Sequence, residues 1–192
     1  MRTRKYRFFS CDFETTVYEG QQSTEVWASA CVELFTEDVK ILHSIDETFE
    51  YFKSLKSNII AYYHNLKFDG SFWLSYLITE KHFAQAYTSI GDKVTDIEWK
   101  HEKDMLPNTF KYSISEQGQW YSIIIRVGKY FIEIRDSLKL LPFSVKRIGE
   151  SFGTKHKKLE MEYKGFRYAG CEITEEEKKY IANDVLVVKE AL

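Results

Sequence analysis

The sequence predicts an α/β protein in which a mixed sheet is flanked by helices. Stretches rich in β-branched and aromatic residues alternate with stretches of helical period along most of the 192 residues. Hydrophobic residues make up 44% of the chain and aromatic residues 16%, which is enough for one well-filled core. No linker-like stretch divides the sequence, so a single domain is expected.

The first half is expected to hold four strands and two helices. The strands are predicted from β-branched and aromatic runs at 6–14, 25–35, 39–44 and 58–64. A helix is predicted from Ser44 onward, because Ser44 and Glu47 have capping-box spacing ahead of an apolar stripe. A second helix is predicted over 68–78. Residues 81–108 are polar and lack a clear period, so no element is assigned to them.

The second half is expected to contain a three-stranded meander and two helices. The meander covers 110–137, with turns near Gly118 and Gly128. A short helix is predicted over 144–152, and a longer one closes the chain at 174–192.

The closing helix has the clearest signals in the sequence. Thr174 is expected to cap it, with Glu177 completing a capping box. Its buried stripe is predicted to consist of Ile181, Val185, Val188 and Leu192.

Charge and cysteine content exclude several classes of protein. A formal net charge of −2 argues against a globally basic nucleic-acid binder, although a local basic patch remains compatible with it. The three cysteines lie far apart and form no CxxC pair, which argues for a reducing compartment and against a disulfide framework or a zinc knuckle. No apolar run is long enough to cross a membrane. A cytoplasmic protein without a membrane partner is expected.

The first strand carries two acids on one face. Asp12 and Glu14 are two residues apart and therefore point the same way, while Cys11 and Phe13 point to the opposite face. A carboxylate on a buried strand is costly unless it is neutralised. Carboxylate pairs suit Mg²⁺ or Mn²⁺, although a solvated strand end is the simpler interpretation of an isolated D-x-E.

Further acids make the metal interpretation more specific. Asp69 follows a strand, where it is either a ligand or a solvated acid that stabilises the start of a helix. Tyr180 and Asp184 are four residues apart on the closing helix and share a face. Taken by itself, Tyr180 is interpreted as an aromatic residue of the core. Together these residues form an ordered set of D-x-E, N-x-x-x-D and Y-x-x-x-D.

This ordered set resembles the DEDD exonucleases, in the subgroup with a tyrosine in the third motif. The resemblance extends to blocks outside the acids: "SCDFETT", "HNLKFDG", "LPNT", "GQWY", "DSLKLLPFSVKRI" and "YIAND". In this order they are similar to the N-terminal proofreading domain of protein-primed family B DNA polymerases of phages and related mobile elements. The match runs from about Ser10 to Leu192, nearly the whole chain.

The resemblance implies a ribonuclease-H-like fold and one 3′–5′ exonuclease domain over residues 1–192. It implies a two-metal site for Mg²⁺ or Mn²⁺, with the ligands Asp12, Glu14, Asp69 and Asp184. Tyr180 would help to orient the attacking water. The single-stranded DNA 3′ end would be held by Thr15, Asn65, Phe68, Ser137, Leu138, Lys158 and Tyr163.

The resemblance also implies partners and a cellular context. The expected partners are a single-stranded DNA 3′ end and a terminal (priming) protein, with the domain itself a monomer in the cytoplasm of a phage host. No room is left for polymerase palm, fingers and thumb, so the chain is either an excised domain or a short natural protein. Residues 81–108 are longer and more charged than the resemblance leads us to expect.

Of two alternatives, the first stays open and the second is rejected. The chain could be a non-catalytic ribonuclease-H-like module that binds a primer end or a terminal protein, although all four acids are present. His64 and Asp69 have the H-x-x-x-x-D spacing of the histidine subgroup, but that interpretation leaves Tyr180 and Asp184 unused. The acids alone do not distinguish DNA from RNA, which depends on how a site treats the 2′-hydroxyl.

Overall fold

The structure is a computed structural model that describes residues 4–15 and 19–192. The strands of its main sheet are β1 Tyr6–Glu14, β2 Ala28–Glu33, β3 Val39–Leu42, β4 Asn58–Tyr63, β5 Ala84–Gln85, β8 Thr109–Ile114, β9 Trp120–Val127 and β10 Tyr130–Asp136. The α-helices are α1 Ile45–Ser54, α2 Leu66–Thr79, α3 Val145–Ser151 and α4 Glu175–Ala191. Short 3₁₀ turns cover Glu102–Asp104 and Ser137–Lys139.

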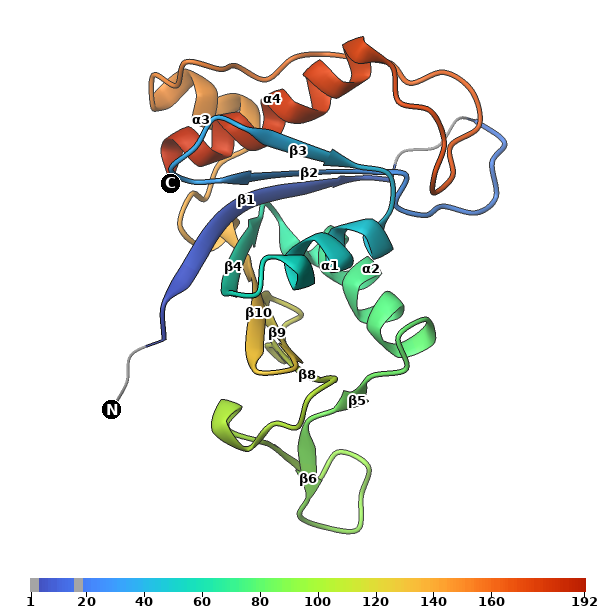
Figure 1. Cartoon of the computed structure of the whole chain (residues 1–192), viewed down its shortest axis with the longest axis vertical. Helices are drawn as coiled ribbons and strands as arrows, with labels where there is room; N and C mark the ends of the chain where they lie inside the picture. Colours follow the sequence, from blue (N-terminus) through green and yellow to red (C-terminus); the bar gives the residue numbers. More distant parts are fainter. Residues whose placement is uncertain (1–3, 16–18) are drawn as a thin grey trace.

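The sheet is mixed and has helices on both faces (Figure 1), as the sequence predicts. Its eight strands lie in the order β3-β2-β1-β4-β10-β9-β8-β5. β1, β4 and β10 are parallel neighbours, while β2, β3, β8 and β9 join the sheet as antiparallel strands. The predicted meander is confirmed as β8, β9 and β10.

The two faces of β1 are used differently. Phe9, Cys11 and Phe13 belong to the main core, which includes Phe52 of α1 and Trp73 of α2. On the other face, the Ser10 hydroxyl donates to the Val185 carbonyl of α4 at 2.9 Å. The period-2 expectation for this strand therefore holds, and the acids of β1 share the face covered by α4.

Three details differ from the sequence-based expectations. α2 begins at Leu66, so Asp69 lies inside its first turn. Thr174 does cap α4 by accepting from the Glu177 amide, but the Glu177 carboxylate turns away to pair with Arg167. Leu192 is 38% exposed, whereas Val187 and Val188 of the last turns of α4 are buried, so the predicted buried stripe ends at Val188.

Residues 81–108 form a small extension beyond the main sheet. β5 pairs with β8, and a hairpin follows, built from β6 Tyr87–Ser89 and β7 Ile97–Trp99. This hairpin lies at the end of the molecule opposite α3 and α4 (Figure 1). β5 has two residues, and β6 and β7 have three residues each, which explains why no sequence period was visible.

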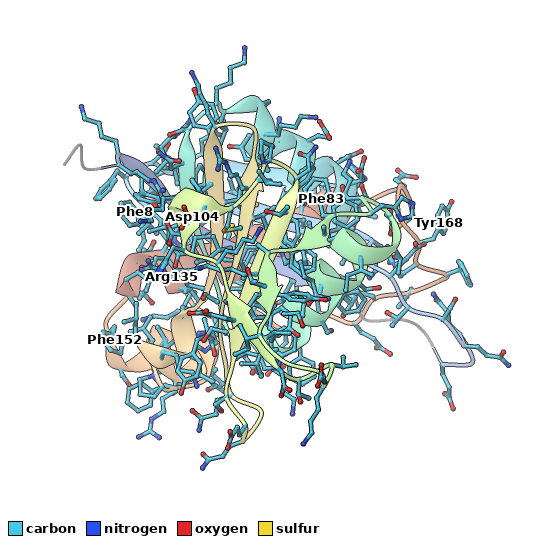
Figure 2. The ribbon with its side chains drawn as sticks, turned by 90° about the horizontal axis from the view of Figure 1, so that it is seen from below. Phe8, Phe83, Asp104, Arg135, Phe152 and Tyr168 are labelled. Carbon is cyan, nitrogen blue, oxygen red and sulfur yellow. The ribbon has the colours of Figure 1, made fainter. Side chains whose placement is uncertain are left out.

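Residues 153–174, between α3 and α4, contain neither helix nor strand. Phe152, just before this segment, and Tyr168, within it, lie on opposite sides of the view in Figure 2, so the segment crosses the molecule. Within the part of the chain that the structure describes, every helix is too short or too polar to cross a membrane.

Candidate functional site

The site lies where the carboxyl ends of the parallel strands meet. β1 ends at Glu14, β4 ends at Tyr63 and leads into α2, and β10 ends at Asp136. Cys11 and Asp136 are both register partners of Tyr63. Ligands of α/β sheets bind at this edge, because the loops leaving parallel strands converge there.

Three carboxylates come together at this edge. Asp12, Glu14 and Asp184 each offer an oxygen, and these oxygens lie within 4.8 Å of one another. Glu14 and Asp184 are buried and Asp12 is partly buried. We refer to these three residues as the acid cluster.

The acid cluster carries more negative charge than its surroundings neutralise. Burial raises the pKa of Asp12 to about 7, with the Asp184 charge adding to the shift. Burial raises the pKa of Glu14 to about 8, with the charges of Asp12 and Asp184 adding to it. Burial also raises the pKa of Asp184, against the opposing effect of Lys158. Such shifts show carboxylates that disfavour ionisation unless a cation joins them.

Lys158 supplies the one positive charge that faces this cluster among the described residues. Its ammonium donates to Asp184 Oδ2 and, at 3.0 Å, to the Tyr180 hydroxyl. Burial alone would lower the pKa of Lys158, but these two contacts outweigh it and hold the pKa above the usual lysine value. Tyr180 and Asp184 thus share a helix face, as predicted, and both meet Lys158.

Tyr163 covers the same edge from the 153–174 segment. Its ring packs edge-on against Tyr180, with centroids 5.8 Å apart, and against Trp27 at 4.8 Å. Burial raises the pKa of Tyr163, and the nearby Glu14 charge raises it further. Its phenol therefore stays protonated and can serve as a hydrogen-bond donor next to the acids.

Asp69 stands close to the acid cluster without belonging to its tightest group. Asp69 is buried, and burial together with the charges of Asp12 and Glu14 raises its pKa well above the usual value. Gly70, the next residue of α2, brings the helix against Trp120, since an added Cβ would lie 2.7 Å from the Trp120 ring. This close approach holds the first turn of α2 against β9.

A second group of predicted residues gathers around Asp136. Its Oδ1 accepts from the amides of Asn65 at 3.1 Å, Leu66 at 3.3 Å and Leu138 at 2.9 Å. One buried carboxylate therefore fixes the start of α2 and the turn after β10 together. Asn65 adopts a left-handed conformation with φ of 67°, and Phe68 projects outward with 67% of its surface exposed.

Ser137 and Thr15 occupy less open positions. Ser137 is fully buried, and its hydroxyl donates to the Tyr63 carbonyl at 3.3 Å and contacts His64 Nδ1 at 3.0 Å. His64 Nε2 contacts the Phe143 carbonyl at 2.7 Å, so its ring supports the turn after β10. The Thr15 carbonyl accepts from the Thr24 hydroxyl at 2.6 Å.

Sequence reasoning missed two residues that organise the site. Asp136 precedes a short turn, and an aspartate at such a position is a recognisable N-cap signal. Arg167 has no comparable signal, because its partner Glu177 follows it by ten residues along an irregular segment.

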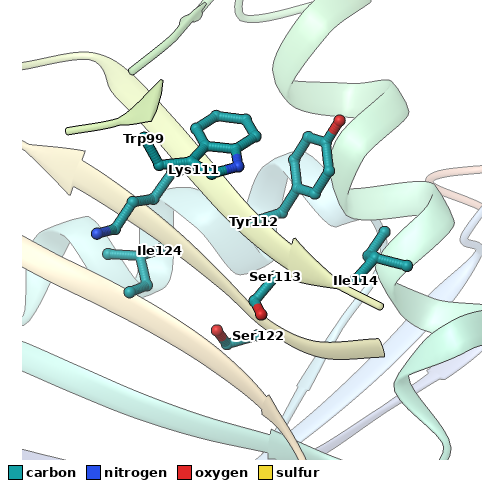
Figure 3. A pocket seen from close by; sticks show the side chains of 7 residues that line it. All are labelled: Trp99, Lys111, Tyr112, Ser113, Ile114, Ser122 and Ile124. Carbon is teal, nitrogen blue, oxygen red and sulfur yellow. The ribbon is translucent and has the colours of Figure 1, made fainter. Parts of the chain in front are cut away.

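A separate hollow of about 410 Å³ opens over β8 and β9 (Figure 3). It is lined by Trp99, Lys111, Tyr112, Ser113, Ile114, Ser122 and Ile124. The Lys111 ammonium donates to the Lys100 carbonyl at 3.0 Å. None of the predicted site residues lines this hollow, so we assign it no role.

The donor set of the acid cluster fits a hard divalent cation. Asp184 Oδ1 is buried and accepts no hydrogen bond from the described residues. A group of three carboxylates, one of which has a buried oxygen without a donor, suits Mg²⁺ or Mn²⁺ better than softer metals. Asp69 of α2 lies near this group, since the charges of Asp12 and Glu14 help to raise its pKa.

Comparison with known proteins identifies the family. A family model described as DNA polymerase type B, organellar and viral, matches residues 50–171. The chain belongs to this family. The DNA polymerase of Bacillus phage Nf is 38% identical over 192 residues, covering 97% of this chain and 30% of the relative. That of Bacillus phage phi29 is 35% identical over 198 residues, covering 100% of this chain and 31% of the relative. The chain thus spans less than a third of the length of these relatives.

Solved structures confirm the predicted fold class. Phi29 DNA polymerase complexed with primer-template DNA and incoming nucleotide substrates matches with a TM-score of 0.77 at 34% identity, covering 100% of this chain and 30% of that one. The same polymerase complexed with single-stranded DNA matches with a TM-score of 0.75, covering 98% of this chain. The family and the fold expected from the sequence motifs are therefore both confirmed.

Proposed function

We propose that the chain is the 3′–5′ exonuclease domain of a protein-primed phage-type DNA polymerase. It would hydrolyse phosphodiester bonds at single-stranded DNA 3′ ends and so proofread the product of that polymerase. The observation that carries this proposal is the acid cluster, which gathers Asp12, Glu14 and Asp184 beside Tyr180 in a member of a DNA polymerase family.

Each group near the cluster has a defined role in this proposal. Asp12, Glu14, Asp69 and Asp184 would hold two Mg²⁺ or Mn²⁺ ions. Such ions activate water and stabilise the charge that develops on a phosphodiester. The Tyr180 hydroxyl would position the attacking water, and Lys158 fixes that hydroxyl through its 3.0 Å contact.

The remaining predicted residues around the acid cluster would hold the substrate as a single strand. Phe68 is exposed next to Asp69 and can stack on a base, and the partly buried ring of Tyr163 would contact the strand from the 153–174 segment. Asn65 and Leu138 are fixed by Asp136 and would present polar and apolar surface to sugar and base, with Thr15 beside Glu14. The buried Ser137 would contribute by supporting His64.

The same relatives support the proposed substrate. The similar phi29 structures hold primer-template DNA or single-stranded DNA, which supports DNA as the substrate here. We also propose a terminal protein as a partner of the complete polymerase, a monomeric domain, and the cytoplasm of a host cell as the place of action.

A digestion time course tests the proposal directly. Single strands of DNA and of RNA, labelled at the 3′ or the 5′ end, are incubated with and without Mg²⁺. We expect stepwise shortening of DNA from the 3′ end that depends on Mg²⁺.

A matched control uses two aspartates outside the site. Asp12→Ala with Asp69→Ala should abolish shortening, whereas Asp38→Ala with Asp92→Ala, at two exposed positions, should preserve it. Binding of the single strand without any shortening by the wild-type chain would contradict the proposal and support the non-catalytic binding module instead.

A further inference from the structure

The 153–174 segment carries Lys158 and Tyr163 without regular secondary structure to hold them. A segment of this length lacking helix or strand is unusual in a compact domain and is often functional. Its positioning must come from specific side-chain contacts, and these contacts lie on both sides of Lys158 and Tyr163.

The contacts before Lys158 attach the segment to the C-terminal half of α4. The Asn183 amide donates to the Lys157 carbonyl. The Glu190 carboxylate accepts from the His156 amide at 3.1 Å and contacts His156 Nδ1 at 2.5 Å. Lys158 therefore enters the acid cluster from a chain fixed immediately before it.

The contacts after Tyr163 centre on Arg167. Its two terminal nitrogens donate to Glu177 on α4, at 3.0 Å to Oε2 and 2.8 Å to Oε1. Nη2 also donates to the Lys164 carbonyl at 2.8 Å. Both partners are almost fully buried, with Arg167 6% and Glu177 8% exposed. Bidentate pairs of this kind fix geometry as well as charge.

The backbone of Arg167 is held as firmly as its side chain. Gln21 accepts from the Arg167 amide at 3.3 Å and donates to the Arg167 carbonyl at 2.8 Å. Arg167 is thus tied to the segment that follows β1 and to the first turn of α4, two elements that border the site.

Arg167 also touches the aromatic residues that reach the acid cluster. Its guanidinium lies 4.7 Å from the centroid of Trp27 and 5.5 Å from that of Tyr163. Tyr163 in turn packs against Trp27 and Tyr180. A planar guanidinium can stack and form two parallel hydrogen bonds at once, which a lysine ammonium cannot do.

We infer that Arg167 is a positioning residue for the exonuclease reaction, which acts by fixing Tyr163 over the acid cluster and the bound single strand. This inference rests on the proposed function. The Arg167 guanidinium donates to Glu177 and Lys164, and neither residue belongs to the acid cluster. Arg167 affects the reaction only through its contact with the Tyr163 ring, and its bidentate hydrogen bonds to Glu177 hold the guanidinium in place.

The test measures single-strand binding and turnover separately. A 5′-labelled oligothymidylate is titrated by fluorescence anisotropy without Mg²⁺, and KM and kcat are measured with Mg²⁺. Arg167→Met should weaken binding and raise KM by about 5- to 100-fold, the range for losing one base-stacking contact. Tyr163→Ala should have a similar effect. In the Tyr163→Ala background, Arg167→Met should add no further loss.

A matched control separates positioning from stability. Arg7 forms the same type of bidentate pair with Glu33, at 2.8 Å for both bonds, and lies 5.5 Å from the Phe9 ring at the start of β1. Arg7→Met should change thermal unfolding while leaving KM unchanged. Should Arg167→Met not fold, Arg167→Lys is used, with the joint substitution of Arg167 and Glu177 by Met as the apolar replacement of the pair.

The outcomes distinguish this inference from the proposed function. Wild-type KM in Arg167→Met or Arg167→Lys, or losses that add to those of Tyr163→Ala, would overturn the inference while wild-type digestion still supports the function. A wild-type chain that neither binds nor shortens the oligonucleotide would overturn both.

Discussion

The acid cluster and the Arg167–Glu177 pair both bury carboxylates on α4, but they differ in charge balance. Glu177 meets a guanidinium in two hydrogen bonds, so its charge is fully matched. Asp12, Glu14 and Asp184 share one ammonium, that of Lys158. Helix α4 therefore contributes to two different groups. One is a charge-matched pair that holds the 153–174 segment, and the other is a group of excess negative charge that suits cations.

Removing an acid from the unmatched acid cluster together with the neighbouring Asp69 should have the largest effect on activity. Asp12→Ala with Asp69→Ala is expected to lower Mg²⁺-dependent hydrolysis by roughly 10³-fold or more, because the metal ligands supply several kcal/mol of transition-state stabilisation. The metal-free variant should unfold at the same temperature as the wild type or higher, since repulsion among carboxylates is relieved. Digestion assays and thermal unfolding in EDTA check both points; a clear loss of stability would show that the acids are structural.

Removing the acid of the matched pair should have the opposite effect on stability. Glu177→Ala leaves Arg167 buried without its partner, and we expect the free energy of unfolding to fall by about 3–5 kcal/mol. The control is Glu175→Ala, because Glu175 is 90% exposed and its contact with Lys178 is worth under about 1 kcal/mol. Urea unfolding measures the free energy of unfolding of both variants. Equal losses in Glu177→Ala and Glu175→Ala would show that the buried pair stabilises the fold no more than an exposed one.

Tyr180→Phe tests whether the hydroxyl beside the acid cluster acts in turnover or in Mg²⁺ binding. Removing the hydroxyl should slow turnover by about 10- to 10³-fold, the scale of one positioned hydrogen bond in a transition state. Mg²⁺ affinity should change little, because the phenol accepts from Lys158 and is not counted as a ligand. Mg²⁺ titrations followed by intrinsic fluorescence, together with turnover rates, provide the measurements. A parallel loss of Mg²⁺ affinity would make Tyr180 a structural support of the cluster.

The smallest expected effect is on the pH dependence of stability, which reflects the excess negative charge of the acid cluster. The pKa of Asp12 rises from 3.8 to about 7 and that of Glu14 from 4.5 to about 8. Between about pH 5 and pH 8 the folded, metal-free chain therefore binds protons that the unfolded chain has released, so its stability falls as pH rises. His64 acts in the opposite direction, because burial lowers its pKa.

Thermal unfolding in EDTA across this pH range isolates the contribution of the acids. Asp12→Asn should flatten the decline relative to the wild type, and Mg²⁺ should stabilise the wild type more at pH 8 than at pH 5. An unchanged slope in Asp12→Asn would show that Asp12 is ionised to the same extent in the folded and the unfolded chain, and so contributes nothing to the decline.

The sequence alone determined most of the elements outside residues 81–108 and most of the chemistry on them. Period-2 alternation placed Asp12 and Glu14 on one face of β1, and the spacing of four placed Tyr180 with Asp184 on α4, because these relations depend only on local backbone geometry. Only the tertiary structure decided which side chains of different elements contact one another. It joined Asn65 to Leu138 through Asp136, buried Ser137 behind His64, and turned Glu177 from a cap to Arg167. Such contacts link residues far apart in the chain, and no local period or propensity encodes which partner a buried charge will meet.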